Sequence, residues 1–176
     1  GGYIIQLIES GFADVICSTG AQVYHDAHFA FGLPVVQGSS NVNDNQLNAD
    51  GTVRIYDTFI GREETLIVQD EKFREFGRKF GKRLQGKEIS SADYNYGWGK
   101  FLLENSPHPD ESWLAAAAKH KVPVFWDSES NHSIGMNNAA LYLEGIKSSP
   151  NPDISLLQAA SILFCNPQSG FFELGG

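Results

Sequence analysis

The segment Lys121-Val-Pro-Val-Phe-Trp-Asp-Ser-Glu-Ser-Asn-His-Ser-Ile-Gly135 begins as an apolar run and changes abruptly to small and polar residues. The same change occurs in Ala13-Asp-Val-Ile-Cys-Ser-Thr-Gly20 and in Gly170-Phe-Phe-Glu-Leu-Gly-Gly176. Short apolar runs with such boundaries are typical of buried strands. In an open parallel sheet, ligands bind beyond the carboxyl ends of the strands. We therefore expect a functional site where these three segments end.

Helical patterns separate the predicted strands. We expect helices over residues 3–8, 24–31, 63–84, 90–103, 112–120, 136–144 and 153–164. We expect strands over residues 13–17, 122–126 and 171–174, and a short edge strand within 52–60. Residues 38–51, rich in Ser, Asn, Asp and Gly, are predicted to be an exposed excursion. This alternation indicates an α/β fold with a mostly parallel sheet flanked by helices, and we assign residues 1–176 to a single α/β domain.

The composition argues against a nucleic-acid partner. In this chain of 176 residues, 21 carboxylates outnumber 13 Lys and Arg residues, for a formal net charge of −8. Nucleic-acid binding usually needs a basic surface, whereas this balance suits a small cationic substrate. No run approaches the roughly 20 apolar residues of a membrane span, so we expect no membrane partner either.

Two cysteines, Cys17 and Cys165, lie within apolar runs. We expect them to be buried, reduced thiols and not part of a disulfide framework, which favours a cytoplasmic location. Cys17 has no basic residue beside it in the sequence, so we interpret it as a packing residue and not as a nucleophile.

Both ends of the sequence are unusual for a complete domain. The chain starts without Met, and a predicted helix begins almost at once, at Tyr3. The last predicted strand runs directly into Leu174-Gly-Gly176, where a ligand loop is expected to begin. We therefore expect an internal portion of a longer protein, an incomplete part of a larger ligand-binding domain.

The turn after the first predicted strand contains Ser18, Thr19, Gly20 and Ala21, followed by a predicted helix. Free backbone N–H groups at a helix N-terminus favour a bound phosphate. The turn has neither the G-x-G-x-x-G nor the G-x-x-x-x-G-K-[ST] pattern. An ordinary tight strand-to-helix turn is therefore the alternative interpretation.

The second predicted strand is followed by hydrogen-bonding residues over 131–138. Ser133 fits a helix N-cap, but that role does not explain the polar residues around it. On the preceding helix, His25, Asp26 and His28 are metal-ligand types, yet only two of them can face one point and no further His or Cys cluster completes a set. We predict no metal site and prefer a hydrogen-bonding role for His25 and Asp26.

Aromatic residues suggest a second kind of site. A cation pocket and ordinary core packing are the two interpretations of Tyr24, Trp113, Trp126 and Tyr142.

Four separated blocks, in order over almost the whole chain, resemble the deoxyhypusine synthase family. They are Ser18-Thr-Gly-Ala-Gln-Val-Tyr-His-Asp26, Asn48-Ala-Asp-Gly-Thr-Val-Arg-Ile-Tyr-Asp57, Glu111-Ser-Trp-Leu-Ala-Ala-Ala-Ala-Lys-His-Lys-Val-Pro-Val-Phe125 and Phe172-Glu-Leu-Gly-Gly176. The segment Asn131-His-Ser-Ile-Gly-Met-Asn137 is most similar to the bacterial and archaeal deoxyhypusine-synthase-like branch.

The resemblance implies a Rossmann-like fold and an NAD-dependent transferase. In this family NAD oxidises spermidine, the aminobutyl part passes to an enzyme lysine as an imine, and a second amine receives it. In the true synthases that amine is a lysine of a protein, a translation factor. Some relatives instead make homospermidine or use other polyamine-like amines. Family members are homotetramers whose active sites lie between paired subunits.

The resemblance also assigns site residues, position by position. Thr19, Gly20 and Ala21 match the turn that contacts NAD, and Gly176 matches a glycine beside the cofactor. Two further groups of positions are implied. NAD is also expected at His25, Asn131 and Ser133, and the amine at Tyr24, His25, Asp26 and Met136.

The sequence departs from the eukaryotic pattern at the amine site. His25, Asn131 and Met136 stand where those enzymes carry carboxylates, which removes attraction for a polyamine cation, so a smaller or differently charged amine is an alternative to spermidine. The family's catalytic lysine lies beyond the Leu-Gly-Gly segment and its early NAD loop before Gly1, so the catalytic residue is unknown here. Lys119 and Lys121 are expected to face solvent. A non-catalytic homologue, and an unrelated α/β ligand-binding domain, are the alternative interpretations.

Overall fold

A parallel pair of strands lies at the centre of the computed structural model, which describes residues 1–174. Strand β1 (Ile16–Ser18) pairs with β5 (Val124–Trp126), with Ile16 opposite Val124 and Ser18 opposite Trp126. The N–H group of Asp127 extends the ladder by donating to the carbonyl oxygen of Ser18 at 3.1 Å. Two of the predicted strands therefore lie side by side, and their carboxyl ends meet at one edge.

Helix α5 (Ser91–Asn105) packs against this pair and carries the centre of the core. Its Asn95 donates from Nδ2 to the carbonyl oxygen of Val124 at 2.8 Å. The Trp98 side chain has 0% exposure, and its ring stacks on that of Phe73 with centroids 4.1 Å apart. Aromatic pairs of this kind add stabilisation beyond the apolar area that they bury.

Helix α6 (Trp113–His120) packs closely along α5, and α1 (Gly2–Glu9) covers α6 from the other side. The close approach depends on Gly99, because an added Cβ would lie only 2.6 Å from both the Cβ of Ala118 and the carbonyl oxygen of Leu114. The alanine-rich sequence of α6 thus permits short interhelical distances.

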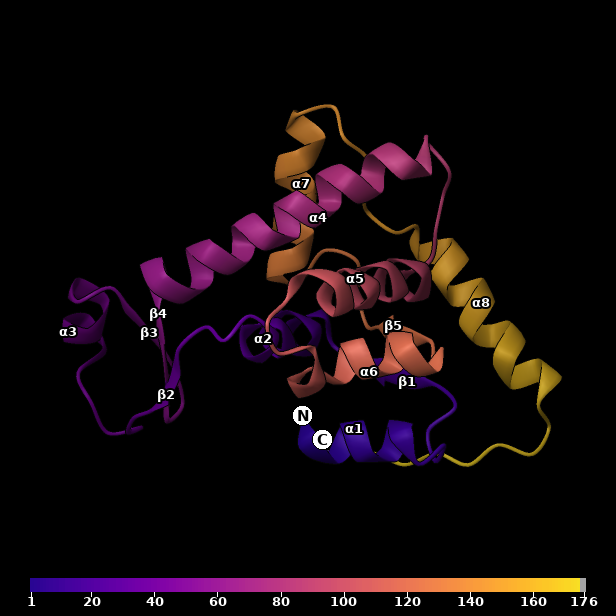
Figure 1. Ribbon diagram of the computed structural model, residues 1–176, viewed down its shortest axis with the longest axis horizontal. Coiled ribbons are helices and arrows are strands. Elements are labelled where there is room, and N and C mark those ends of the chain that lie inside the picture. Colours follow the sequence, from indigo (N-terminus) through magenta and orange to yellow (C-terminus); the bar gives the residue numbers. More distant parts are fainter. Residues whose placement is uncertain (175–176) are drawn as a thin grey trace.

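Helix α4 (Val68–Leu84) is the long helix that runs across the top of Figure 1, and α7 (Ser133–Leu143) crosses it. The residues before α4, Arg62–Ile67, form a π-helical turn, so the predicted helix over 63–84 is confirmed with a wider first turn. At the crossing, a Cβ on Gly77 would overlap the side chain of Leu141. Gly77 therefore allows the two helices to cross closely.

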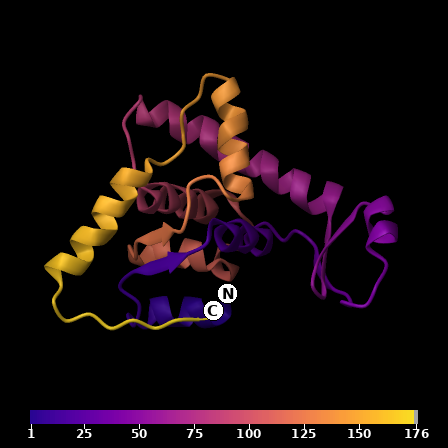
Figure 2. The same cartoon turned by 180° about the vertical axis from the view of Figure 1, so that it is seen from behind.

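A second, antiparallel sheet lies to one side of this body, beyond the start of α4 (Figures 1 and 2). It contains β2 (Val35–Gln37), β3 (Thr52–Ile55) and β4 (Thr58–Gly61) in the order β2-β4-β3. Residues 38–51 are largely exposed, as predicted, but they include the short helix α3 (Asp44–Ala49). The predicted edge strand over 52–60 is a hairpin of two strands.

The α/β class is confirmed, whereas the predicted mostly parallel sheet is wrong for the described residues. Only β1 and β5 are parallel, and the larger sheet is antiparallel, because β3 and β4 are joined by a two-residue turn that returns the chain directly. A Rossmann-like arrangement stays a prediction.

The predicted strand over residues 171–174 is wrong. Helix α8 (Pro152–Cys165) leads into residues that have neither helical nor strand structure, and in both views this tail runs back toward α1 (Figures 1 and 2). Phe171 is 86% exposed, and no strand within residues 1–174 pairs with this segment. An extended segment forms a strand only when a neighbour satisfies its backbone groups.

Two helices begin earlier than predicted. Helix α2 (Gly20–Ala30) starts four residues before Tyr24, with Thr19 as its N-cap, and α7 starts three residues before Met136, with His132 as its N-cap. Ser133 is thus the first helical residue, so its N-cap interpretation is wrong. The first turns of both helices contain small residues, which the sequence pattern did not distinguish from a loop.

The burial expected of the two cysteines is wrong. Cys17 and Cys165 are both free and both exposed, since Cys17 lies on a sheet of only two strands and Cys165 on the largely exposed α8. Burial of part of the Cys17 side chain still raises the pKa of its thiol. Lys119 and Lys121 are exposed, as predicted. None of the helices within residues 1–174 combines the length and the apolar character that a membrane crossing requires.

Candidate functional site

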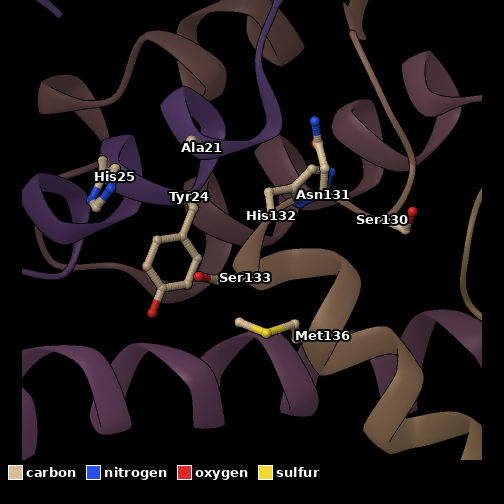
Figure 3. Close-up of a pocket in the computed structure, with 8 residues that line it drawn as sticks. All are labelled: Ala21, Tyr24, His25, Ser130, Asn131, His132, Ser133 and Met136. Atoms are coloured by element: carbon tan, nitrogen blue, oxygen red, sulfur yellow. The ribbon is translucent and has the colours of Figure 1, made fainter.

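A pocket of about 320 Å³ opens at the carboxyl edge of β1 and β5, between α2 and the segment that joins β5 to α7. Ligand pockets in proteins are usually of this size or larger. Eight residues line it, and Figure 3 shows them: Ala21, Tyr24, His25, Ser130, Asn131, His132, Ser133 and Met136.

The N-terminus of α2 forms one side of the pocket. Thr19 caps the helix, because its Oγ1 accepts from the N–H group of Gln22 at 3.2 Å. The N–H group of Gly20 donates to Oδ1 of Asp127 at 3.3 Å, and Oδ2 of Asp127 accepts from Nδ2 of Asn131 at 3.4 Å. A carboxylate therefore stands where a helix N-terminus would attract a phosphate. This arrangement favours the tight-turn interpretation for Gly20.

His132 joins the two sides of the pocket. Its Nδ1 accepts from the N–H group of Gly135 at 3.2 Å, and its Nε2 lies 2.9 Å from the carbonyl oxygen of Ser128, to which it must donate. Burial lowers the pKa of His132, consistent with a neutral ring. The ring covers Gly20 so closely that a Cβ at that position would overlap it. Gly20 is thus required by the packing of His132.

Tyr24 is held by a polar network that connects three helices. Its hydroxyl donates to Oδ1 of Asp70 on α4 at 2.9 Å, and burial beside Asp70 raises the pKa of Tyr24 far above its ordinary value. The same oxygen accepts from Nδ2 of Asn137 on α7 at 2.7 Å, whose Oδ1 accepts from Nε of Arg74 at 2.9 Å. The Tyr24 ring is fixed at the floor of the pocket, next to Ser133 (Figure 3).

His25 lies on the opposite side of Tyr24 from Asn131 (Figure 3). Its Nδ1 is 3.0 Å from Nε2 of His28, one helical turn later. Burial lowers the pKa of His25. The His28 ring is 1% exposed. Both rings are therefore neutral at neutral pH, and one proton lies between them.

Asp26 is turned away from the pocket and toward α6. Its Oδ1 accepts from the N–H group of Trp113 at 3.1 Å, and its Oδ2 accepts from the hydroxyl of Ser112 and from the N–H group of Leu114 at 3.2 Å. Burial raises the pKa of Asp26 to about 6, although these hydrogen bonds oppose the shift. Asp26 thus caps α6, and the structure does not bring it together with Tyr24 and His25 at the pocket.

The structure brings most of the predicted site residues together. Six line the pocket: Ala21, Tyr24, His25, Asn131, Ser133 and Met136. Thr19 and Gly20 are adjacent to it in the same turn, and Gly176 lies outside the described residues.

The sequence interpretation gave no individual site role to Asp127, Ser130 and His132, although His132 lies within the hydrogen-bonding segment 131–138. The signal was present, because all three belong to the polar segment that follows the second predicted strand. Their contacts with α2 have no local signature, however, since Asp127 and Gly20 are far apart in the sequence.

The aromatic residues proposed for a cation pocket do not form one. Trp113 and Trp126 belong to the core, Tyr142 is 63% exposed, and Tyr24 alone lines the pocket. Core packing is therefore correct for the two tryptophans and for the Tyr24 ring, which is 3% exposed and belongs to the same core. In residues 1–174, no three His, Cys, Asp or Glu side chains are arranged to hold a metal ion.

Comparison with known proteins connects this site to a family. The family model for deoxyhypusine synthase matches residues 1–176. This match overturns the alternative of an unrelated α/β domain.

Individual relatives support the same assignment. The chain is 35% identical over 169 residues to the "Deoxyhypusine synthase-like protein" of Nostoc punctiforme, an alignment that covers 93% of this chain and 42% of the relative. It is 33% identical over 144 residues to "Probable deoxyhypusine synthase 2" of Methanosarcina mazei, an alignment that covers 82% of this chain and 40% of the relative. It is 32% identical over 148 residues to the "Deoxyhypusine synthase-like protein" of Coxiella burnetii, an alignment that covers 84% of this chain and 39% of the relative. The chain spans about two fifths of the length of these relatives.

Proposed function

Because this chain belongs to the deoxyhypusine synthase family, we propose that it is the central portion of an NAD-dependent transferase. The enzyme moves an aminobutyl group from spermidine or a related amine, through an imine on an enzyme lysine, to a second amine. The observation that carries the proposal is the pocket at the shared edge of β1 and β5, which gathers six residues matched to the family's NAD and amine positions. The proposal includes a cytoplasmic homotetramer, and a lysine of a translation factor as the acceptor in a true synthase.

The residues of the pocket fit the neutral parts of NAD. Ser130, Asn131 and Ser133 offer two hydroxyl groups and an amide, which suit ribose hydroxyls and a carboxamide. The cofactor would supply the hydride acceptor of the reaction. Its phosphates do not fit at Gly20, because Asp127 already accepts from that N–H group and would repel them. We therefore expect other groups to hold the phosphates.

The amine would lie near Tyr24, His25 and Met136, with its apolar carbons against the aromatic ring and the thioether. None of the eight lining residues is acidic. The Asp70 carboxylate lies behind Tyr24, and its Oδ1 already accepts two hydrogen bonds. This uncharged lining favours a short amine with few charges over a long polyamine.

The direct test uses the intact parent protein with NAD and a panel of amines that includes spermidine. Amine-dependent formation of NADH, and trapping of a lysine-linked imine by borohydride, are the expected results. Absence of both with every amine would defeat the catalytic proposal.

A second candidate is a non-catalytic homologue, a regulatory subunit or NAD-binding module. The absence of carboxylates among the lining residues favours it, because a polyamine cation then has no direct counter-charge in the pocket. The sequence of the parent protein discriminates the two candidates: a lysine in a tryptophan-glycine-lysine context after the Leu-Gly-Gly segment supports the enzyme, and its absence supports the module. Calorimetric binding of NAD without amine-dependent reduction would also support the module.

A further inference from the structure

The segment that joins β5 to α7, residues 127–132, forms one wall of the pocket but has neither helical nor strand structure. Ser130, Asn131 and His132 line the pocket from this joining segment. Irregular backbone keeps a fixed position only where other groups bond to it or pack against it. The contacts that hold the joining segment therefore decide the shape of this pocket wall.

Glu129 ties the joining segment to two other elements through its carboxylate. Its Oε2 accepts from Nε1 of Trp126, the last residue of β5, and its Oε1 accepts from the hydroxyl of Ser155 on α8 at 2.8 Å. Trp126 is 7% exposed and Ser155 is 8% exposed, so both donors belong to buried side chains. Hydrogen bonds to a carboxylate are roughly twice as strong as those between neutral groups. Glu129 is thus an anchor for the residue that follows it, Ser130.

The first turn of α7 supports the same part of the joining segment. A Cβ on Gly135 would lie 2.7 Å from Cα of Ser130 and 3.0 Å from the carbonyl oxygen of Glu129. The backbone at these two residues therefore lies directly against α7. Because the carboxylate holds Glu129 while α7 supports its backbone, the pocket wall has one defined position.

Ser155 is also a point at which α8 is tied to the rest of the molecule. It is the buried residue of this helix, and its Oγ accepts from the N–H group of Ser91 at the start of α5 at 2.9 Å. The part of α8 that follows is largely exposed, and the helix lies on the side of the molecule opposite the antiparallel sheet (Figure 1). The bond between Ser155 and Glu129 thus links α8 directly to the pocket wall.

We propose that Glu129 is a positioning residue, whose carboxylate holds the joining segment where Ser130, Asn131 and His132 line the pocket and makes this wall depend on the docking of α8. Glu129 is not among the eight lining residues, so it acts through its neighbours. That the ligand of this wall is NAD rests on the function proposed above.

Hydrogen–deuterium exchange of the intact parent protein, measured at single amides, tests the anchor without any ligand. The reporter is the N–H group of Gly135, which donates to Nδ1 of His132, whose Nε2 is bonded to the carbonyl oxygen of Ser128. This amide is protected while the joining segment keeps its position. We expect Glu129→Ala to speed exchange at Gly135 by roughly tenfold or more, the factor that corresponds to the loss of a hydrogen bond to a charged group.

Glu129→Gln is the conservative variant that should restore protection. Its amide oxygen can accept from Trp126, and its Nε2 can donate to Oγ of Ser155. The Ser155 hydroxyl then turns its proton to the carbonyl oxygen of Asn151, which lies 3.0 Å away. Each group keeps a partner and only the charge is lost, so exchange at Gly135 should stay within about threefold of the original rate.

Two references separate positioning from a general loss of stability. The N–H group of Ser106, which donates to the carbonyl oxygen of Leu102 at 3.0 Å, reports on the end of α5. Glu9→Ala removes an exposed carboxylate from the end of α1 and should change exchange at neither Gly135 nor Ser106. In Glu129→Ala, an equal acceleration at both amides, or an unchanged rate at Gly135, would overturn the proposal.

A second variant keeps the test decisive should Glu129→Ala fail to fold. Ser155→Ala removes the donor to Oε1 and leaves the bond from Trp126 in place. We expect exchange at Gly135 to be faster than in the unchanged protein, by a smaller factor than for loss of the whole carboxylate. An unchanged rate at Gly135 in Ser155→Ala would also overturn the proposal.

Calorimetric titration of the intact parent protein with NAD measures the consequence for the pocket. We expect the affinity for NAD to fall by roughly tenfold in Glu129→Ala and by less than about threefold in Glu129→Gln. Equal NAD affinity in the unchanged protein and in Glu129→Ala would defeat only the positioning role. If the unchanged protein binds no NAD while exchange at Gly135 responds as expected, the proposed function fails and the anchor stands.

Discussion

The two sides of α2 use neighbouring residues for opposite purposes. Asp26 faces α6, where three donors surround its carboxylate. Tyr24 and His25 lie on the side that lines the pocket. Consecutive residues on a helix are about 100° apart, so one step along the chain changes which neighbour a side chain meets.

The difference shows how one helix serves as both scaffold and pocket wall. On the α6 side, the polar groups of Asp26 and Ser112 are satisfied by one another and by the first turn of α6. On the pocket side, His25 keeps a ring nitrogen that no residue within the described part of the chain engages. A group whose hydrogen bonds are completed inside the fold contributes to stability, whereas one with an open position is available to a ligand.

The largest expected effect concerns Asp26 and pH. Burial raises its pKa from an ordinary value of 3.8 to about 6, so the folded state binds this proton more tightly than the unfolded state. The resulting stabilisation is fully present below pH 3.8 and is lost as the pH rises through about 6. Asp26→Asn lacks this titration. The free energy of unfolding of the unchanged protein, relative to that of Asp26→Asn, should fall by about 3 kcal/mol over this range.

Urea unfolding of both proteins at a series of pH values measures that difference. A difference that stays constant across the range would show that Asp26 titrates normally, and the contrast between the two sides of α2 would then be weaker than the structure indicates.

Substitution of Gly20 tests whether the packing of the His132 ring on the pocket side of α2 requires a glycine. Gly20→Ala would force the added Cβ into the His132 ring, and we expect a destabilisation of about 2 kcal/mol in thermal or urea unfolding. Gly2→Ala is the matched control, since an added Cβ there meets nothing within 4 Å. In a His132→Ala background the cost of Gly20→Ala should largely disappear. Persistence of the full cost there would assign it to the backbone and not to the ring.

A smaller effect is expected from Tyr24→Phe. The variant keeps the stacked ring but loses the hydroxyl that donates to Asp70, whose Oδ1 still accepts from Asn137. We expect a loss of about 1 kcal/mol in the free energy of unfolding. Tyr96→Phe, at a 43% exposed position, is the control and should change stability by less than about 0.5 kcal/mol. Equal losses in the two variants would indicate that the Asp70 contact contributes nothing.

The smallest effect on stability is expected at Met136. Its side chain is 66% exposed and lines the pocket. Met136→Ala should change the free energy of unfolding by less than about 0.5 kcal/mol. Calorimetry with the intact parent protein should instead show affinity for the pocket ligand lowered by about threefold, through lost apolar contact. A large loss of stability with unchanged affinity would show that Met136 stabilises the fold and does not contact the ligand.

Local sequence patterns predicted the existence of helices and strands better than the residues at which they begin and end. The helix over 90–103 is found as Ser91–Asn105, because apolar spacing and a capping box both mark it. The starts of α2 and α7 were missed, because Thr19 and His132 cap them ahead of the first apolar residues. The segment 171–174 has the composition of a strand but no partner among the described strands.

The pocket was predictable to a similar degree. The carboxyl ends of the first two predicted strands do meet, and the residues that follow them line one pocket. The third predicted strand end contributes nothing that the structure describes, since residues 171–174 form no strand and Gly176 lies outside the described residues.

The sequence by itself determined the two strands that form the parallel pair, the small and polar residues that follow them, and the family to which the chain belongs, because these properties can be read from residues that are neighbours in the chain. Only the tertiary structure decided that Asp26 caps α6, that Asp127 occupies the N-terminus of α2, and that Gln69 on α4 donates to the carbonyl oxygen of Tyr24. Each of these contacts joins distant segments. Their formation depends on how α4, α6 and β5 pack around α2, which no local pattern encodes.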